Sequence, residues 1–78
     1  MKATNKVINK KYYELNKGDV VQFVLGVLPD YTYDCTFDYY EEVKEDWAKG
    51  KYVTIYFSDS EVNICIEKDD DVEVVVKE

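Results

Sequence analysis

The chain has 78 residues, the length of one small domain, and we expect a single domain over residues 1–78. Its ten basic residues are all lysine and face 17 acidic residues, and histidine is absent. Lack of histidine, of a glycine-rich phosphate loop and of a nucleophile motif argues against an enzyme. The acidic balance argues against direct binding of nucleic acid or of an anionic membrane.

The first half of the chain predicts strands. A weak strand signal covers Thr4–Ile8, and "NKGD" (16–19) predicts a turn, because asparagine and glycine tolerate positive φ. Residues 20–28 read as a strand that ends at Leu28-Pro29-Asp30, since proline removes a ladder donor. Residues 31–37 alternate large apolar and small polar side chains, which predicts a further strand.

The segment "TFDYYEEVKEDWAKG" (36–50) predicts an amphipathic helix. Asp38 and Glu41 have the spacing of a capping box, and Lys49-Gly50 is a typical helix end. At 100° per residue, the large apolar side chains fall within one arc and the carboxylates within the opposite arc. The apolar arc holds Phe37, Tyr40, Val43 and Trp47, and the acidic arc holds Asp38, Glu41, Glu42, Glu45 and Asp46.

Three further strands are predicted over residues 51–57, 62–67 and 72–77, joined by short polar turns. Short connections favour antiparallel hairpins, so we expect these strands to form a meander. The predicted fold is therefore α+β, with a small antiparallel sheet, one amphipathic helix and the order β-β-β-α-β-β-β. The spacing does not distinguish an open sheet from a partly closed, SH3-like barrel.

Charge divides the chain into two unequal parts. Residues 1–17 carry five lysines and one glutamate (5 − 1 = +4), whereas residues 18–78 carry five lysines and sixteen acids (5 − 16 = −11). An acidic body of this kind attracts a basic protein. The N-terminal lysines either neutralise part of that body or protect a strand edge from aggregation.

Neither a cofactor nor a metal is expected. The oxygen-rich stretches 59–61 and 68–73 lack the spacing of a calcium loop and read as solvated turns. Cys35 and Cys65 have no metal or redox spacing, and we expect reduced thiols in the cytoplasm; a disulfide between them stays open for a secreted protein. Residues 20–28 are too short to span a bilayer.

Tyrosines and acids interleave in "YTYDCTFDYY" (31–40), next to the predicted acidic helix face. Carboxylates on a rigid element can stand in for phosphates, and tyrosine rings supply contact area. In size and composition the chain is similar to small acidic inhibitors of nucleases and other DNA-handling enzymes, many of them phage-encoded, although it shares no motif with them. The predicted partner-binding residues are Asp34, Asp38, Tyr39, Glu41, Glu42, Glu45, Asp46, Tyr52 and Tyr56.

We therefore expect an inhibitor that blocks a basic nucleic-acid-binding surface of a partner enzyme, such as a nuclease, by nucleic-acid mimicry. The alternative is a non-catalytic adaptor or a homo-oligomerisation module that binds through exposed tyrosines or a free sheet edge. Salt distinguishes the two, because a charge-dependent complex weakens with salt and a tyrosine-dependent one resists it.

Overall fold

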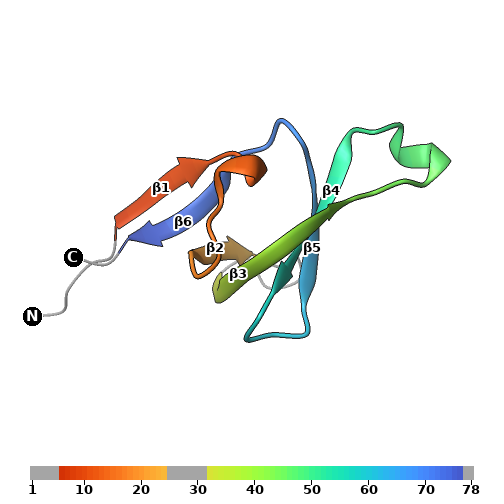
Figure 1. Cartoon of the computed structure of the whole chain (residues 1–78). Helices are drawn as coiled ribbons and strands as arrows, with labels where there is room; N and C mark the ends of the chain where they lie inside the picture. The colour runs from red at the N-terminus through yellow and green to blue at the C-terminus, as the bar shows by residue number, and fades with distance from the viewer. Residues whose placement is uncertain (1–5, 25–31, 77–78) are drawn as a thin grey trace, which may run out of the picture.

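The computed structural model describes residues 6–24 and 32–76, which form one antiparallel sheet (Figure 1). Its six strands lie in the order β1-β6-β2-β3-β4-β5, so β1 and β5 are the edges of the described sheet. The strands are β1 (Lys6–Lys10), β2 (Val20–Val24), β3 (Thr32–Glu42), β4 (Tyr52–Phe57), β5 (Asn63–Glu67) and β6 (Val72–Val76). Two 3₁₀ turns, η1 (Tyr12–Glu14) and η2 (Asp46–Ala48), complete the described elements.

Strand β4 shows why these segments form a sheet. Val53, Ile55 and Phe57 are buried, whereas the alternate residues of the strand are only partly buried. This period of two places β-branched and aromatic side chains on one core-facing side. The predicted inward positions of residues 51–57 are thus confirmed.

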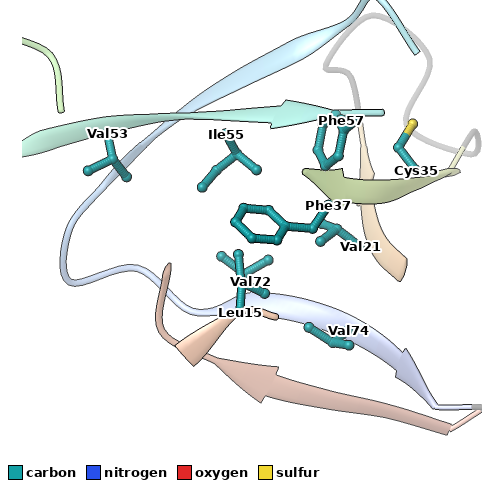
Figure 2. Packing of buried hydrophobic residues seen from close by; sticks show 9 residues of the cluster. All are labelled: Leu15, Val21, Cys35, Phe37, Val53, Ile55, Phe57, Val72 and Val74. Carbon is teal, nitrogen blue, oxygen red and sulfur yellow. The ribbon is translucent and has the colours of Figure 1, made fainter. Parts of the chain in front are cut away.

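The core lies between two parts of the bent sheet. In Figure 2, Val53, Ile55 and Phe57 of β4 approach from one side, and Leu15, Val72 and Val74 approach from the other. Phe37 lies between them, and the ring of Phe57 stacks on Phe23 with centroids 5.3 Å apart. A fully buried valine or isoleucine contributes about 1.5–3 kcal/mol, so this small cluster is the main source of stability.

The predicted helix is wrong. No α-helix occurs in residues 6–24 and 32–76; residues 38–42 continue β3, and only Asp46–Ala48 form a 3₁₀ turn. The described part of the chain is therefore all-β rather than α+β. The register of β3 against β4 shifts between Phe37 and Tyr39, which marks a β-bulge at Asp38. The bulge separates two core-facing residues, Phe37 and Tyr40, by three positions, and that spacing imitates one helical turn.

The predicted C-terminal meander is only partly correct. β4 and β5 form an antiparallel pair, but β6 leaves β5 and inserts between β1 and β2. The short 68–71 connection therefore crosses from one half of the sheet to the other. The crossing carries Val72 and Val74 to the opposite side of the core, where both are buried.

Several smaller expectations can be compared with the described residues. The 16–19 turn is confirmed, with the Asp19 N–H bonded to the Asn16 carbonyl at 2.9 Å and Gly18 at φ 101°. In the described residues the first strand covers Lys6–Lys10, so it ends at Lys10 rather than at the predicted Ile8. The predictions for residues 4–5, 25–31 and 77, including the turn at Pro29, lie outside the described residues.

Three N-terminal lysines pair with acids of the acidic body. Lys10 binds Asp19 at 3.0 Å, Lys11 binds Asp71 at 2.8 Å, and Lys17 lies 3.4 Å from Asp38. These contacts favour the neutralising role among the two alternatives for these lysines. No described helix is long and apolar enough to cross a membrane.

Candidate protein-binding face

The bulge at Asp38 determines which side chains of β3 face outward. Before the bulge, Cys35 and Phe37 are buried, so Asp34 and Thr36 lie on the outer side. After it, Tyr40 pairs with buried Ile55 and takes the inner side, which places Tyr39 and Glu41 outside. Strict alternation from Phe37 would instead have pointed Tyr39 and Glu41 into the core. The bulge thus places Tyr39 and Glu41, rather than Tyr40 and Glu42, on the outer face.

Four aromatic rings lie on this outer side of β3 and β4. Tyr39 pairs with Tyr56 across the strands, and their rings stack with centroids 4.6 Å apart and planes at 15°. Farther along β4, Tyr52 contacts Trp47 of η2 at 5.4 Å. Tyr39 and Trp47 are 47% and 63% exposed, so both rings are open to solvent. We call this surface the aromatic face: Tyr39, Glu41, Trp47, Tyr52, Thr54 and Tyr56.

Glu41 gives the aromatic face a defined charge. Desolvation raises the pKa of Tyr56, and the nearby Glu41 carboxylate raises it further, as a negative charge and as a hydrogen-bond acceptor. The Tyr56 hydroxyl therefore stays protonated at neutral pH, and the Glu41 carboxylate lies near it beside the stacked rings. A carboxylate beside exposed ring faces suits a lysine or arginine side chain.

A second carboxylate, that of Asp59, is hydrogen-bonded to the middle of β3 on its outer side. Asp59 accepts hydrogen bonds from the Thr36 N–H at 2.9 Å and from its hydroxyl at 2.7 Å. These bonds lower the pKa of Asp59. Nearby Asp34 accepts a bond from the Gln22 amide at 3.3 Å. Acids therefore lie on both sides of Tyr39 along the outer side of β3.

The carboxylates predicted for one helix face do not share a face. Glu41 points outward, whereas Glu42 pairs with Val53 on the inner side and binds Lys68 at 3.2 Å. Asp38 occupies the bulge and lies beside Lys17. Glu45 and Asp46 lie at the β3–β4 connection among Lys44, Lys49 and Lys51. The single-sign helical surface is thus replaced by a mixed-charge hairpin tip and a separate aromatic face.

Of the nine residues predicted for partner binding, the structure groups Tyr39, Glu41, Tyr52 and Tyr56 on the aromatic face. Asp34 lies on the same outer side of β3 beyond the bulge. Sequence reasoning missed Trp47, which was assigned to the core. No periodic signal identifies it, because η2 is too short to have one. The alternation of residues 51–57 does predict the outward direction of Tyr52 and Tyr56.

The described residues offer little for catalysis or metal binding. Within residues 6–24 and 32–76 no three potential metal ligands come together. The hollow beside the aromatic face, lined by Glu41, Glu42 and Lys44, is wide and open to solvent. Both cysteines are free, Cys35 buried and Cys65 exposed. The arrangement suits contact with another surface more than enclosure of a small molecule.

Searches of protein-family models, curated proteins and solved structures find no match to this chain. The function is therefore argued from the residues of the aromatic face and from the charge of the chain.

Proposed function

We propose that this protein is a non-catalytic, protein-binding inhibitor whose aromatic face docks on a basic surface of a partner. The observation that carries the proposal is the stacked Tyr39–Tyr56 pair beside Glu41 on an outer sheet face. Exposed tyrosine and tryptophan rings are typical of interface centres, where they bury large areas at low entropic cost. We place the activity in the cytoplasm, where free thiols such as those of Cys35 and Cys65 persist.

The charge of the chain selects the class of partner. Residues 18–78 carry a formal charge of 5 − 16 = −11, and the lysines at positions 10, 11 and 17 offset part of this by pairing with Asp19, Asp71 and Asp38, none of which belongs to the aromatic face. A field of this sign raises the rate of association with a positively charged protein and repels an acidic one. Lysine and arginine side chains of the partner would contact Glu41 and the ring faces.

The finer form of the proposal is that the blocked surface normally holds nucleic acid. Asp34 and Glu41 lie on the outer side of the same strand, and Tyr39 lies between them in sequence, so charge and ring alternate as phosphate and base do. A groove lined with lysine or arginine binds both kinds of feature. Under this form, the partner cannot hold nucleic acid and this protein together.

The test compares the aromatic face with η1, which carries the same residue types at another place. Full-length protein is immobilised, exposed to cell lysate and eluted with a salt gradient, using wild type and four variants. Tyr39→Ala and Glu41→Gln alter the aromatic face, while Tyr13→Ala and Glu14→Gln make identical chemical changes at η1. We expect the bound proteins to elute as salt rises and to be lost from the two face variants only.

Competition then addresses the nucleic-acid form of the proposal. Heparin or duplex DNA added before elution should release the captured protein, because a shared groove cannot hold both ligands. If all four variants capture the same proteins as wild type, the aromatic face is not the contact surface. If capture depends on the face but resists both polyanions, the partner is basic but its nucleic-acid site is not involved.

A further inference from the structure

The outer edge of β5 has unpaired backbone groups in a regular pattern. The Lys68 N–H bonds to the Lys51 carbonyl at 2.8 Å, so these residues form a hydrogen-bonded pair of the antiparallel ladder. Bonded and non-bonded pairs alternate, and the bonded pairs are therefore Val53–Ile66 and Ile55–Ile64. It follows that the N–H and carbonyl groups of Asn63, Cys65 and Glu67 point away from β4.

Only one of these three outward N–H groups has a partner. The Asp70 carboxylate accepts the Glu67 N–H at 3.2 Å and so closes that end of the edge. Within residues 6–24 and 32–76 no acceptor is bonded to the N–H of Asn63 or of Cys65. The outward backbone groups of Asn63 and Cys65 are thus available to pair with another strand.

The edge at β5 also has fewer of the features that normally prevent strand addition than the opposite edge has. Its sequence, "NICIE", contains neither lysine nor proline, and no register shift interrupts its pairing with β4. The opposite edge, β1, has Lys6 and Lys10 at its two ends. The two edges of the sheet therefore differ, and β5 is the less protected one.

An apolar groove of about 260 Å³ borders the inner side of β5. Ile64 and Ile66 form one wall, and Phe23 and Val72 lie on the other. In a strand added to β5, alternate side chains would fall on the same face as Ile64 and Ile66 and so reach this groove. The β5 edge therefore offers an added strand both backbone hydrogen-bonding groups and a groove for its alternate side chains.

We propose that β5 accepts an extended, basic segment of a partner protein as a seventh strand. The charge at the site favours a basic occupant, because Glu67 lies on the outer side at the end of β5 and Glu73 lines the groove, whereas Asp71 is already paired with Lys11. The segment alternates apolar side chains, which enter the groove, with lysine or arginine, which lie on the outer side with Glu67. This edge adjoins the aromatic face, since Cys65 and Asn63 pair with Thr54 and Tyr56, but the proposal does not depend on the function proposed for that face.

The probe is a capped peptide that alternates lysine and valine over about seven residues, the length of an ordinary strand. Its control has the same side chains but carries N-methyl groups on its three central residues, which removes ladder donors whether the added strand runs parallel or antiparallel to β5. Amide hydrogen exchange of the full-length ¹⁵N-labelled protein is measured with each peptide. We expect the first peptide to slow exchange at Asn63 and Cys65 by more than about tenfold, and the N-methylated peptide to have no such effect. Ile64 and Ile66 already bond to β4 and should change much less.

Two variants test the same edge from the protein side. Cys65→Pro removes one outward N–H without breaking a bond to β4 and should abolish the effect, whereas Cys65→Ser should keep it. If Cys65→Pro does not fold, the comparison of the two peptides still decides the question.

Three results would overturn the proposal. Equal protection by both peptides would mean attraction by charge alone, and protection confined to Tyr39 and Tyr56 would place the peptide on the aromatic face. Slow exchange of Asn63 and Cys65 in the free protein would mean that the edge is already occupied. Whether that slow exchange depends on protein concentration would then distinguish pairing with a second copy of the chain from pairing with a segment of the same chain.

Discussion

The two sides of the β3–β4–β5 half of the sheet are built from the same strands but have different roles. The inner side of β4 presents Val53, Ile55 and Phe57, which are buried. The outer side presents Tyr52, Thr54 and Tyr56, together with exposed Tyr39 from β3. The inner side stabilises the fold through burial, whereas the outer side places rings in solvent, where they contribute little to it. Mutations on the two sides should therefore separate stability from binding.

The largest difference is expected between two neighbours on β4. Ile55→Ala should lower the free energy of unfolding by about 2–5 kcal/mol, because it removes a fully buried side chain and leaves a cavity. Thr54→Ala, on the outer side, should change it by less than about 1 kcal/mol. Urea unfolding of both variants measures the contrast. Equal losses would show that the outer side contributes to the core as much as the inner side does.

The second-largest difference is expected between the reactivities of the two cysteines. Cys35 lies on the inner side, where burial raises the pKa of its thiol, whereas Cys65 is exposed on the outer side. Because the thiolate is the reactive form, a disulfide reagent should label Cys65 at least about tenfold faster than Cys35. Single variants, Cys35→Ser and Cys65→Ser, assign the two phases. Fast labelling of both thiols in the folded protein would contradict the burial of Cys35.

Acid should weaken the fold through two carboxylates. Hydrogen bonds from Thr36 lower the pKa of Asp59. For Asp19, partial burial raises the pKa, but hydrogen bonds from Asn16 and Lys10 outweigh the burial, so the pKa of Asp19 is lowered as well. Both groups have a pKa below the ordinary 3.8 when folded, so their contribution is present above pH 3.8 and is lost as pH falls through the folded values. Unfolding measured from pH 7 to pH 2.5 should show this loss, and it should be smaller in Asp59→Asn. An unchanged slope in that variant would assign the loss to other groups.

The smallest effect is expected for Tyr56→Phe, which removes one hydroxyl and keeps the ring stack with Tyr39. The unfolding midpoint should hardly move, but the alkaline end of the tyrosine absorbance titration should disappear, because desolvation and Glu41 raise the pKa of Tyr56. Glu41→Gln should shift that component toward ordinary tyrosine in the wild-type background. A titration unaffected by either change would mean that Glu41 does not act on Tyr56.

Prediction from the sequence succeeded where one period described the whole element. The alternation of residues 51–57 identified the inner and outer side chains of β4, and the asparagine and glycine of residues 16–19 identified the turn. It failed at residues 38–49, where a bulge gave Phe37 and Tyr40 a helical spacing and where a 3₁₀ turn followed. Of the nine predicted binding residues, Tyr52 and Tyr56 lie on the aromatic face because the outward positions of β4 did not depend on the bulge, whereas Tyr39 and Glu41 face outward because of it.

The sequence alone determined the net charge, the strand periodicity and the abundance of tyrosine, since these depend only on local composition and order. The tertiary structure decided where β6 inserts and which side Tyr39 and Glu41 face. Both outcomes depend on burying apolar surface between segments distant in the chain, and the free energy of that burial is shared across the whole core. A local pattern cannot record such a contribution, and a single extra residue at Asp38 was enough to reverse what the pattern predicted.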